Sequence, residues 1–276
     1  MQLDYKGFRE MGFTTEEINA LYADATLNPC ELLTNEYLMI KDEDGNIADY
    51  MRWSGTALEE VSRKPIQSKW GGVVKPRNPQ QIMAFDMLMN PEITIKAIHG
   101  RFGSGKDFIM INAALSLIEH GKYEKIIWVR NNIEVKNTTP LGALPGSAYE
   151  KLSPFLMPFA DHVGGIEGVE ELVRQKKVEV EHLGFIRGRD FKKSIIYCSE
   201  AENITTQHCQ LLIGRVGEGS ALWINGDCKQ TDKLVFEENN GLFNAIIKLK
   251  GNPLFGFIHL EKSERSKTAA LADLLD

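Results

Sequence analysis

The sequence predicts an α/β fold, a mainly parallel sheet flanked by helices, preceded by a small N-terminal α+β segment. From Pro76 onward, short β-branched runs alternate with amphipathic stretches, which is typical of strands and helices that follow each other in a parallel sheet. The stretch HGRFGSGKDFIM, at His99 to Met110, joins such a run to such a stretch and has the spacing of a phosphate-binding loop. Ligands of these sheets bind at the carboxyl ends of the strands, where this loop is expected to lie.

The individual elements follow from the same alternation. The strand candidates are Ile93–Ile98, Lys125–Arg130, Val178–His182, Ser194–Ser199, Ala221–Asn225 and Leu254–Leu260. The helix candidates are Lys106–His120, Ala148–His162, Val169–Lys176, Thr206–Val216 and Leu242–Lys250. Gly121 and Gly251 follow two of these helices at the position of a C-cap glycine.

Residues 1–75 are predicted to form a small accessory domain, and residues 76–276 the main domain. TTEEINALYAD begins like a helix, with Thr14 as its N-cap and Glu17 completing a capping box. EYLMIKDEDGNIADYMRW predicts a β-hairpin around the turn at Asp44 and Gly45. The glycines and prolines of KWGGVVKPRNP indicate the boundary. Nothing in the first segment indicates catalysis, so we expect a structural role.

The composition is that of an ordinary globular protein. The chain has 276 residues, 43% of them hydrophobic and 25% charged, and a formal net charge of −6. That charge argues against a surface that follows nucleic acid everywhere, although a local basic groove stays open. The four cysteines form no C-x-x-C pair, which favours reduced thiols. We expect a cytoplasmic protein without a membrane span, because no run is long and apolar enough.

The glycine-rich loop carries the strongest chemical signal. Backbone N–H groups of such a loop, together with the N-terminus of the next helix, favour phosphate. Lys106 would bridge the β- and γ-phosphates of a nucleotide. The expected nucleotide-binding residues are Gly100, Arg101, Phe102, Gly103, Ser104, Gly105, Lys106 and Asp107. A glycine-rich turn without a ligand is the alternative interpretation.

Asp107 departs from the usual loop, which carries Ser or Thr at this position to bind magnesium. The strand SIIYCSEAEN departs in the opposite sense, because Ser199 stands where an acidic residue normally holds the metal. We interpret Asp107 and Ser199 as an exchanged pair of magnesium ligands, with the carboxylate on the loop and the hydroxyl on the strand. Glu200 fits the water-activating role. The alternatives are an inactive site, or Asp107 as a residue that only stabilises the helix dipole.

WINGDCKQTD follows the next strand and contains a G-D-x-x-Q arrangement. Asp227 and Gln230 have the pattern of a γ-phosphate sensor in helicase-type ATPases. A solvated polar turn is the alternative.

These motifs together resemble the PhoH family of ATPases over about Pro76 to Ser266. The matching segments are PRNPQQ, GRFGSGKD, VRNNIE, LGALPGSAYEKLSPFLMPFAD, FIRGRDFKKSIIYCSEAEN, LLIGRVGEGS and KSERS. Besides Asp107, the departures are Ser199 for Asp and Glu202 for Gln. The resemblance implies a RecA-like fold related to superfamily-one helicase cores, with Gln81 in the place of the adenine-contacting glutamine.

The resemblance also implies catalytic arginines. Arg215 and Arg265 match family positions and are candidates to meet a γ-phosphate. A superfamily-one helicase uses two RecA-like domains, and this chain has room for one. A homo-oligomer such as a hexamer would let one subunit's arginine complete its neighbour's site.

The stretch from Arg174 to Lys193 contains seven Lys or Arg residues, including Arg187 and Arg189. It predicts either a groove for single-stranded nucleic acid or a solvated charged face. The leading functional hypothesis is an ATPase that uses ATP and Mg²⁺ and couples hydrolysis to work on RNA or single-stranded DNA. The alternatives are a nucleotide-binding switch or scaffold with little turnover, and a P-loop kinase for a small acceptor.

Overall fold

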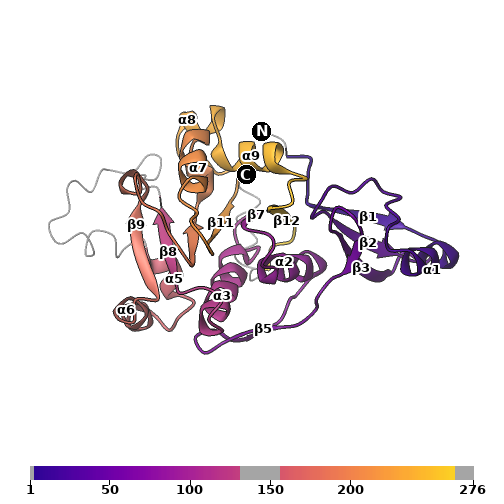
Figure 1. Ribbon diagram of the computed structural model, residues 1–276, viewed down its shortest axis with the longest axis horizontal. Helices are drawn as coiled ribbons and strands as arrows, with labels where there is room; N and C mark the ends of the chain where they lie inside the picture. Colours follow the sequence, from indigo (N-terminus) through magenta and orange to yellow (C-terminus); the bar gives the residue numbers. More distant parts are fainter. Residues whose placement is uncertain (1–2, 131–155, 265–276) are drawn as a thin grey trace.

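The computed structural model describes residues 3–130 and 156–264, which form a parallel sheet domain and a smaller N-terminal module (Figure 1). The strands of the large sheet are β7 (Ile95–Gly100), β8 (Lys125–Arg130), β9 (Val178–His182), β10 (Ser194–Cys198), β11 (Ala221–Gly226) and β12 (Phe255–Leu260). They lie in the order β12-β7-β11-β10-β8-β9, and every pair is parallel. The predicted fold class is confirmed. Strand β11 separates β7, which leads into the glycine-rich loop, from β10, which leads into the acidic segment.

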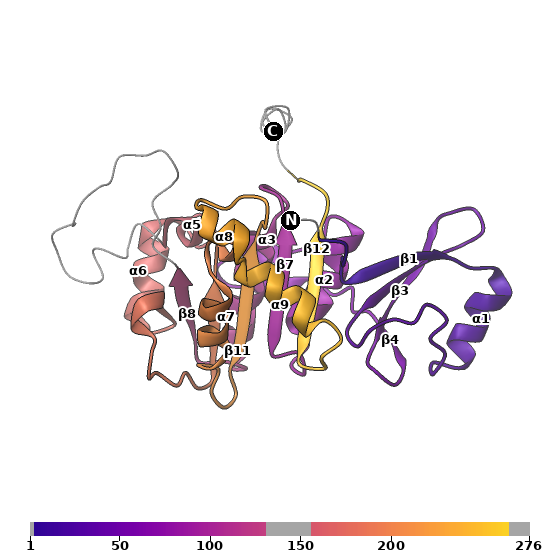
Figure 2. The same cartoon turned by 90° about the horizontal axis from the view of Figure 1, so that it is seen from above.

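Helices cover both faces of this sheet (Figure 2). The helices of the domain are α2 (Pro79–Met89), α3 (Lys106–Glu119), α5 (Met157–Ala160), α6 (Ile166–Arg174), α7 (Thr206–Ile213), α8 (Leu234–Glu238) and α9 (Gly241–Leu249), with the 3₁₀ turns η2 (Leu183–Phe185) and η3 (Ala201–Asn203). One core joins α2, α3, α5 and α6 to one face of the sheet, and a second core joins α7 and α9 to the other face. Most of the strands are therefore buried on both faces, which explains their near-continuous apolar sequences; the edge strand β9, VEVEH, is only partly buried and alternates.

The N-terminal module is a four-stranded sheet with one helix. Its elements are β1 (Phe8–Gly12), α1 (Thr15–Ala23), β2 (Tyr37–Lys41), β3 (Ile47–Trp53) and β4 (Leu58–Glu60). The capping box of Thr14 and Glu17 is present, and β2 and β3 are antiparallel with Gly45 in the left-handed region, as predicted. A further hairpin, β5 (Ile66–Ser68) and β6 (Gly72–Val74), joins the core under α3. The division after residue 75 stays a prediction.

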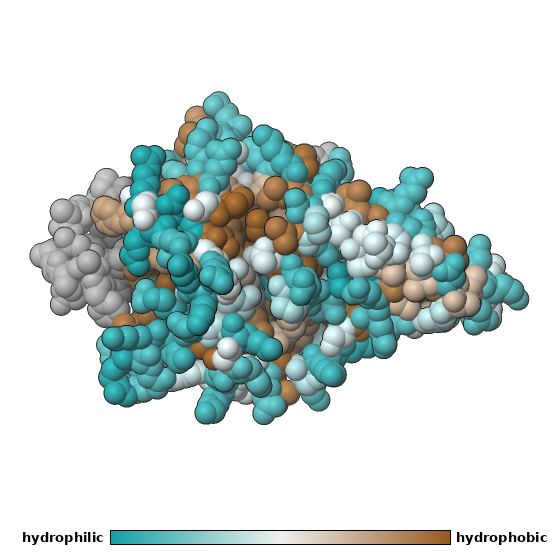
Figure 3. All heavy atoms as spheres, in the orientation of Figure 1, coloured by the Kyte–Doolittle hydropathy of each residue, from teal (hydrophilic) through white to brown (hydrophobic). Residues whose placement is uncertain are grey.

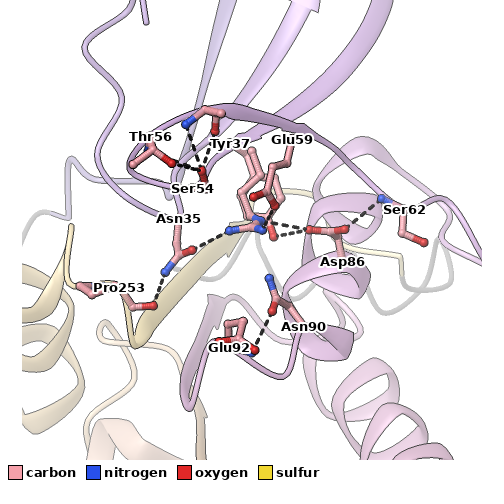
Figure 4. A network of polar contacts seen from close by, with 12 residues as sticks. Asn35, Tyr37, Ser54, Thr56, Glu59, Ser62, Asp86, Asn90, Glu92 and Pro253 are labelled. Carbon is pink, nitrogen blue, oxygen red and sulfur yellow. Dashed lines mark hydrogen bonds and ion pairs between the residues drawn. The ribbon is translucent and has the colours of Figure 1, made fainter. Parts of the chain in front are cut away.

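A polar network fastens this module to the sheet domain (Figure 4). Asp86 of α2 accepts hydrogen bonds from the Tyr37 hydroxyl at 2.9 Å and from the Ser62 backbone N–H at 2.9 Å, and it pairs with Arg52 at 3.7 Å. Asn35 donates to the carbonyl of Pro253 at 2.8 Å, just before β12. Because Tyr37, Arg52 and Asn35 are buried, these bonds fix the orientation of the module against α2.

Two helix predictions need correction. The helix predicted at Thr206–Val216 ends at Ile213, because Gly214 caps it and Val216 forms a parallel bridge with Phe191. Of the helix predicted at Ala148–His162, the structure describes only α5, which ends at Ala160; residues 148–155 lie outside the described residues. The other predicted helices and strands are present with small shifts at their ends.

The surface is largely polar, with apolar side chains gathered near the middle of the face that Figure 3 shows. A cavity of 510 Å³ near the amino ends of the strands is lined by Met89, Leu117, Tyr123 and Lys96. The buried side-chain nitrogen of Lys96 donates to the carbonyls of Leu88 and Asn90, and so satisfies backbone acceptors at the C-terminus of α2. None of the helices in the described ranges is long and apolar enough to cross a membrane.

Candidate nucleotide-binding site

The glycine-rich loop connects the carboxyl end of β7 to the first turn of α3. Gly103 and Gly105 adopt φ values of 72° and 84°, in the left-handed region that a side chain would strain. Gly105 is the N-cap of α3, and no side chain caps this helix end. The N-terminal N–H groups of α3 are therefore available to an anion.

Flanking segments hold this loop in place. Gln81 donates from Nε2 to the Ser104 carbonyl at 3.2 Å, while its Oε1 accepts the Arg77 N–H at 3.0 Å. The Glu264 N–H donates to the Gly103 carbonyl at 2.8 Å. Gln81 thus supports the loop itself, and its contact with adenine stays a prediction. Arg265 comes next after Glu264 and lies outside the described residues.

Lys106 is the first residue of α3 and is almost buried. Its Nζ lies 5.5 Å from the centre of the Phe102 ring, and Phe102 at the tip of the loop is 55% exposed. The ammonium therefore lies within the loop. That is the position from which it can contact phosphates bound by the loop N–H groups.

Asp107 lies in the first turn of α3 and accepts two hydrogen bonds from the sheet. Its Oδ1 accepts from Tyr197 of β10 at 3.2 Å and from Asn225 Nδ2 of β11 at 2.7 Å. Burial, and then the charge of Asp107, raises the pKa of Tyr197 well above its usual value, so the phenol stays a donor. Ser199, two residues beyond Tyr197, is buried and its Oγ has no hydrogen-bond partner. Tyr197 and Asn225 lie inside the segments SIIYCSEAEN and WINGDCKQTD, but neither was predicted as a site residue because each occupies a strand position before the motif's expected functional residues.

Glu200 follows the end of β10 with φ at 52°, a strained value for a residue with a side chain. Its carboxylate forms an ion pair with Arg130, the last residue of the neighbouring strand β8. Arg130 belongs to the segment VRNNIE, but no motif in the sequence indicates that it pairs with Glu200. The side chain of Glu200 is 44% exposed, so it can still reach a ligand at this edge.

Glu202 connects the ends of β10 and β11. Its Oε2 accepts the Asp227 N–H at 3.1 Å, and it is 6% exposed. Burial raises the pKa of Glu202 to about 8, so the carboxyl is largely protonated at neutral pH. A protonated carboxyl has one donor and one acceptor end, like the amide of glutamine.

Asp227 and Gln230 form a turn, because the Gln230 N–H donates to the Asp227 carbonyl at 2.9 Å. His99 Nε2 lies 3.5 Å from Asp227 Oδ1. Burial would raise the pKa of Asp227, but the nearby His99 ring, the hydrogen bond from the Lys229 N–H and the charge of Lys106 hold it below its usual value. Asp227 is therefore ionised beneath the loop, and the buried Gln230 Oε1 has no partner.

Several of the buried polar atoms without a hydrogen-bond partner lie around the loop, among them both ring nitrogens of His99 and four further atoms. These four are Ser104 Oγ, Ser199 Oγ, Asn225 Oδ1 and Gln230 Oε1. All four lie on or just after the loop and the strands at the carboxyl edge of the sheet. Buried polar atoms are rarely left unsatisfied, so their concentration here indicates a site for a polar ligand.

Comparison with known proteins agrees with this geometry. A family model described as "PhoH-like protein" matches residues 73–275, most of the chain. The chain belongs to the PhoH family. It is therefore a P-loop protein of a nucleotide-binding family.

Individual relatives extend this match into the N-terminal module. The chain is 31% identical to "Protein PhoH2" of Bacillus subtilis over 98% of its length and 64% of the relative's length. It is 27% identical to "Protein PhoH2" of Mycolicibacterium smegmatis over 97% of the chain and 61% of the relative. A third relative, "Protein PhoH2" of Thermobispora bispora, is 34% identical over 72% of the chain and 46% of its own length. The chain thus spans about half to two thirds of these relatives, and two of the alignments include nearly all of its N-terminal module.

Arg215 lies far from the loop of its own PhoH-type domain. Its carbonyl accepts the Phe191 N–H at 3.1 Å, and Phe191 precedes the amino end of β10. The loop is at the carboxyl edge, and a five-residue strand such as β10 spans roughly 17 Å. Arg215 therefore does not reach a phosphate held by the loop of the same chain.

The basic stretch from Arg174 to Lys193 is not a bare cationic surface. Several of its members form ion pairs with acidic neighbours: Arg174 with Glu171, Arg189 with Glu181, Lys192 with Asp190, and Lys193 with Glu124. This pairing favours a solvated charged face, and a nucleic-acid groove here stays a prediction.

Glu202→Gln is expected to make the protein less sensitive to rising pH. Between about pH 4.5 and 8 the folded state holds the Glu202 proton that the unfolded state releases, so wild-type stability falls as the pH rises. Glutamine does not titrate. The stability advantage of the variant should therefore grow by a few kcal/mol from pH 5 to 8, at about 1.4 kcal/mol per pKa unit. Denaturant unfolding at several pH values, with the exposed Glu124→Gln as control, measures this; a pH-independent difference would contradict it.

Proposed function

We propose that the chain binds ATP with Mg²⁺ and hydrolyses it, and that it couples hydrolysis to binding or remodelling of RNA or single-stranded DNA. The observation that carries this proposal is the group of partnerless buried polar atoms around the loop, next to Lys106 and Glu200. In the proposed reaction Lys106 contacts the β- and γ-phosphates. Glu200 accepts a proton from the attacking water, and Gln230 contacts the γ-phosphate.

Asp107 and Ser199 are the proposed magnesium ligands. Mg²⁺ prefers oxygen ligands and is commonly held by one or two carboxylates together with phosphates. The residues fit such an ion, because Ser199 Oγ is buried without a partner and Asp107 uses Oδ1 for both of its hydrogen bonds. The ion supplies charge neutralisation between the Asp107 carboxylate and the triphosphate.

Self-association is the proposed way in which Arg215 and Arg265 contact a γ-phosphate. Because Arg215 is too far from the loop of its own chain, the phosphate that it would contact is one bound by a neighbouring subunit. A ring such as a hexamer would supply that neighbour. Arg265 is proposed for the same role. For nucleic acid, the proposal rests on the family resemblance and the basic stretch, whose ion pairs weaken it.

The test is phosphate release from ATP with Mg²⁺ or with EDTA, each without nucleic acid, with RNA and with single-stranded DNA. Magnesium-dependent release that rises with one of the nucleic acids is expected. Asp107→Asn should lower release in Mg²⁺ and tighten ATP binding in EDTA, because it removes a negative charge beside the triphosphate. ATP binding without release under every condition would instead support the second candidate function, a nucleotide-binding switch or scaffold.

A further inference from the structure

Asp107, Tyr197 and Asn225 form a closed triangle of hydrogen bonds between three elements. Asn225 Nδ2 lies 2.7 Å from Asp107 Oδ1 and 2.9 Å from the Tyr197 oxygen, and the Tyr197 hydroxyl lies 3.2 Å from the same Asp107 Oδ1. Because Asn225 donates to the phenol oxygen, the phenol hydrogen is directed toward Asp107. One oxygen of Asp107 therefore receives both donors.

The two donors are held rigidly. Tyr197 is fully buried, and its ring stacks on Trp128 with centroids 4.7 Å apart and planes 11° apart. Asn225 is fully buried on β11, the strand between β10 and β7. Neither donor can follow the carboxylate if it moves, so Asp107 makes both bonds in only one orientation.

The two donors orient the Asp107 carboxylate without neutralising its charge. Both are neutral, and no ion pair to Asp107 occurs among residues 3–130 and 156–264. A basic partner would have cancelled the charge of the carboxylate, whereas an amide and a phenol orient it and leave the charge in place. An oriented, ionised oxygen ligand is what a divalent cation requires.

We propose that Tyr197 and Asn225 are positioning residues that orient Asp107 toward the divalent cation of a bound nucleotide. This rests on the proposed role of Asp107 as a metal ligand. The proposed metal site then involves four residues: the exchanged ligand pair, Asp107 and Ser199, and the two donors that orient Asp107. Changing Asp107 alone to a hydroxyl residue would withdraw a carboxylate from two buried donors.

The experiment compares equilibrium binding of a fluorescent ATP analogue in saturating Mg²⁺ and in EDTA. The ratio of the two dissociation constants measures how much the metal strengthens binding, and it does not require hydrolysis. Tyr197→Phe keeps the stacked ring and removes the donor. It should lower this ratio by about tenfold or more, as loss of an outer-shell partner does, and leave the affinity in EDTA within about twofold.

Tyr37→Phe is the matched control. Tyr37 is also fully buried and donates to a carboxylate, Asp86, but it lies in the N-terminal module. It should lower thermal stability as Tyr197→Phe does and leave the ratio unchanged. Asn225→Leu, which also removes a donor, is the second variant and should lower the ratio as well.

Combination with Asp107→Asn completes the cycle. If Tyr197 acts through Asp107, the double variant should have the ratio of Asp107→Asn alone. An unchanged ratio in both folded Tyr197→Phe and Asn225→Leu, or additive losses in the double variant, overturns the proposal. If the variants lower the ratio but the wild type never hydrolyses ATP, the positioning role of Tyr197 and Asn225 is upheld and the proposed hydrolytic function is wrong.

Discussion

Lys106→Ala is expected to weaken ATP binding by about 100-fold and to reduce turnover below detection. The ammonium lies inside the glycine-rich loop, almost buried, where it contacts phosphates in the proposed complex. A charge-assisted hydrogen bond of this kind contributes about 1.5–3 kcal/mol, and the truncation also removes a positive charge from beside the triphosphate. About 1.4 kcal/mol corresponds to tenfold in affinity. Calorimetric or fluorescence titration with ATP measures the loss directly.

The control for this experiment is Lys122→Ala. Lys122 is exposed after the C-terminus of α3 and lines the cavity near the amino ends of the strands. It carries the same charge as Lys106 but follows the other end of α3, at the opposite edge of the sheet from the loop. ATP affinity in Lys122→Ala should match the wild type. If Lys106→Ala also bound ATP with wild-type affinity, the loop would not be the nucleotide site.

Most strands were predictable because they are buried on both faces and so have a continuous apolar sequence, whereas the edge strand β9 was predictable from its alternating β-branched and charged residues. Lys125–Arg130 and Val178–His182 have the predicted bounds, and the capping box of Thr14 and Glu17 depends on only four residues. Local sequence does not determine strand order, however. The position of β11 between β7 and β10 follows from packing across the whole domain, and no periodicity reveals it.

The site was predictable in its motifs and not in its contacts. Lys106, Glu200 and Asp227 lie at one edge of the sheet because the carboxyl ends of parallel strands meet there. The partners of Asp107 are separated from it by 90 and 118 residues, and both look like ordinary strand residues in the sequence. The same holds for Arg130, whose ion pair with Glu200 depends on the adjacency of β8 and β10.

Arg215 illustrates the limit of transferring a role by motif alone. Its match to a family position predicted a catalytic arginine, and the structure places it at the amino edge of the sheet. A motif specifies which residue is present. Only the fold specifies whether that residue and the loop belong to one site or to the sites of two subunits.

Glu200→Gln is expected to retain ATP binding and to reduce turnover by about 100- to 10,000-fold, the usual contribution of a general base. The amide keeps the size of the carboxylate and cannot take a proton from water. Phosphate release under single-turnover conditions, beside an ATP-binding titration, separates the two effects. A second consequence has to be excluded, because glutamine also breaks the ion pair with Arg130.

Arg130→Gln is the variant that resolves this ambiguity. It breaks the same ion pair and leaves the Glu200 carboxylate in place, so the base remains while its charged neighbour is lost. If Glu200 acts as the base, Arg130→Gln should retain far more turnover than Glu200→Gln. Equal losses in the two variants would mean that the ion pair between β8 and β10 matters and proton transfer to Glu200 does not. Intact turnover in Glu200→Gln would show that Glu200 is not the general base. The positive φ of Glu200 would then not be explained by a catalytic role.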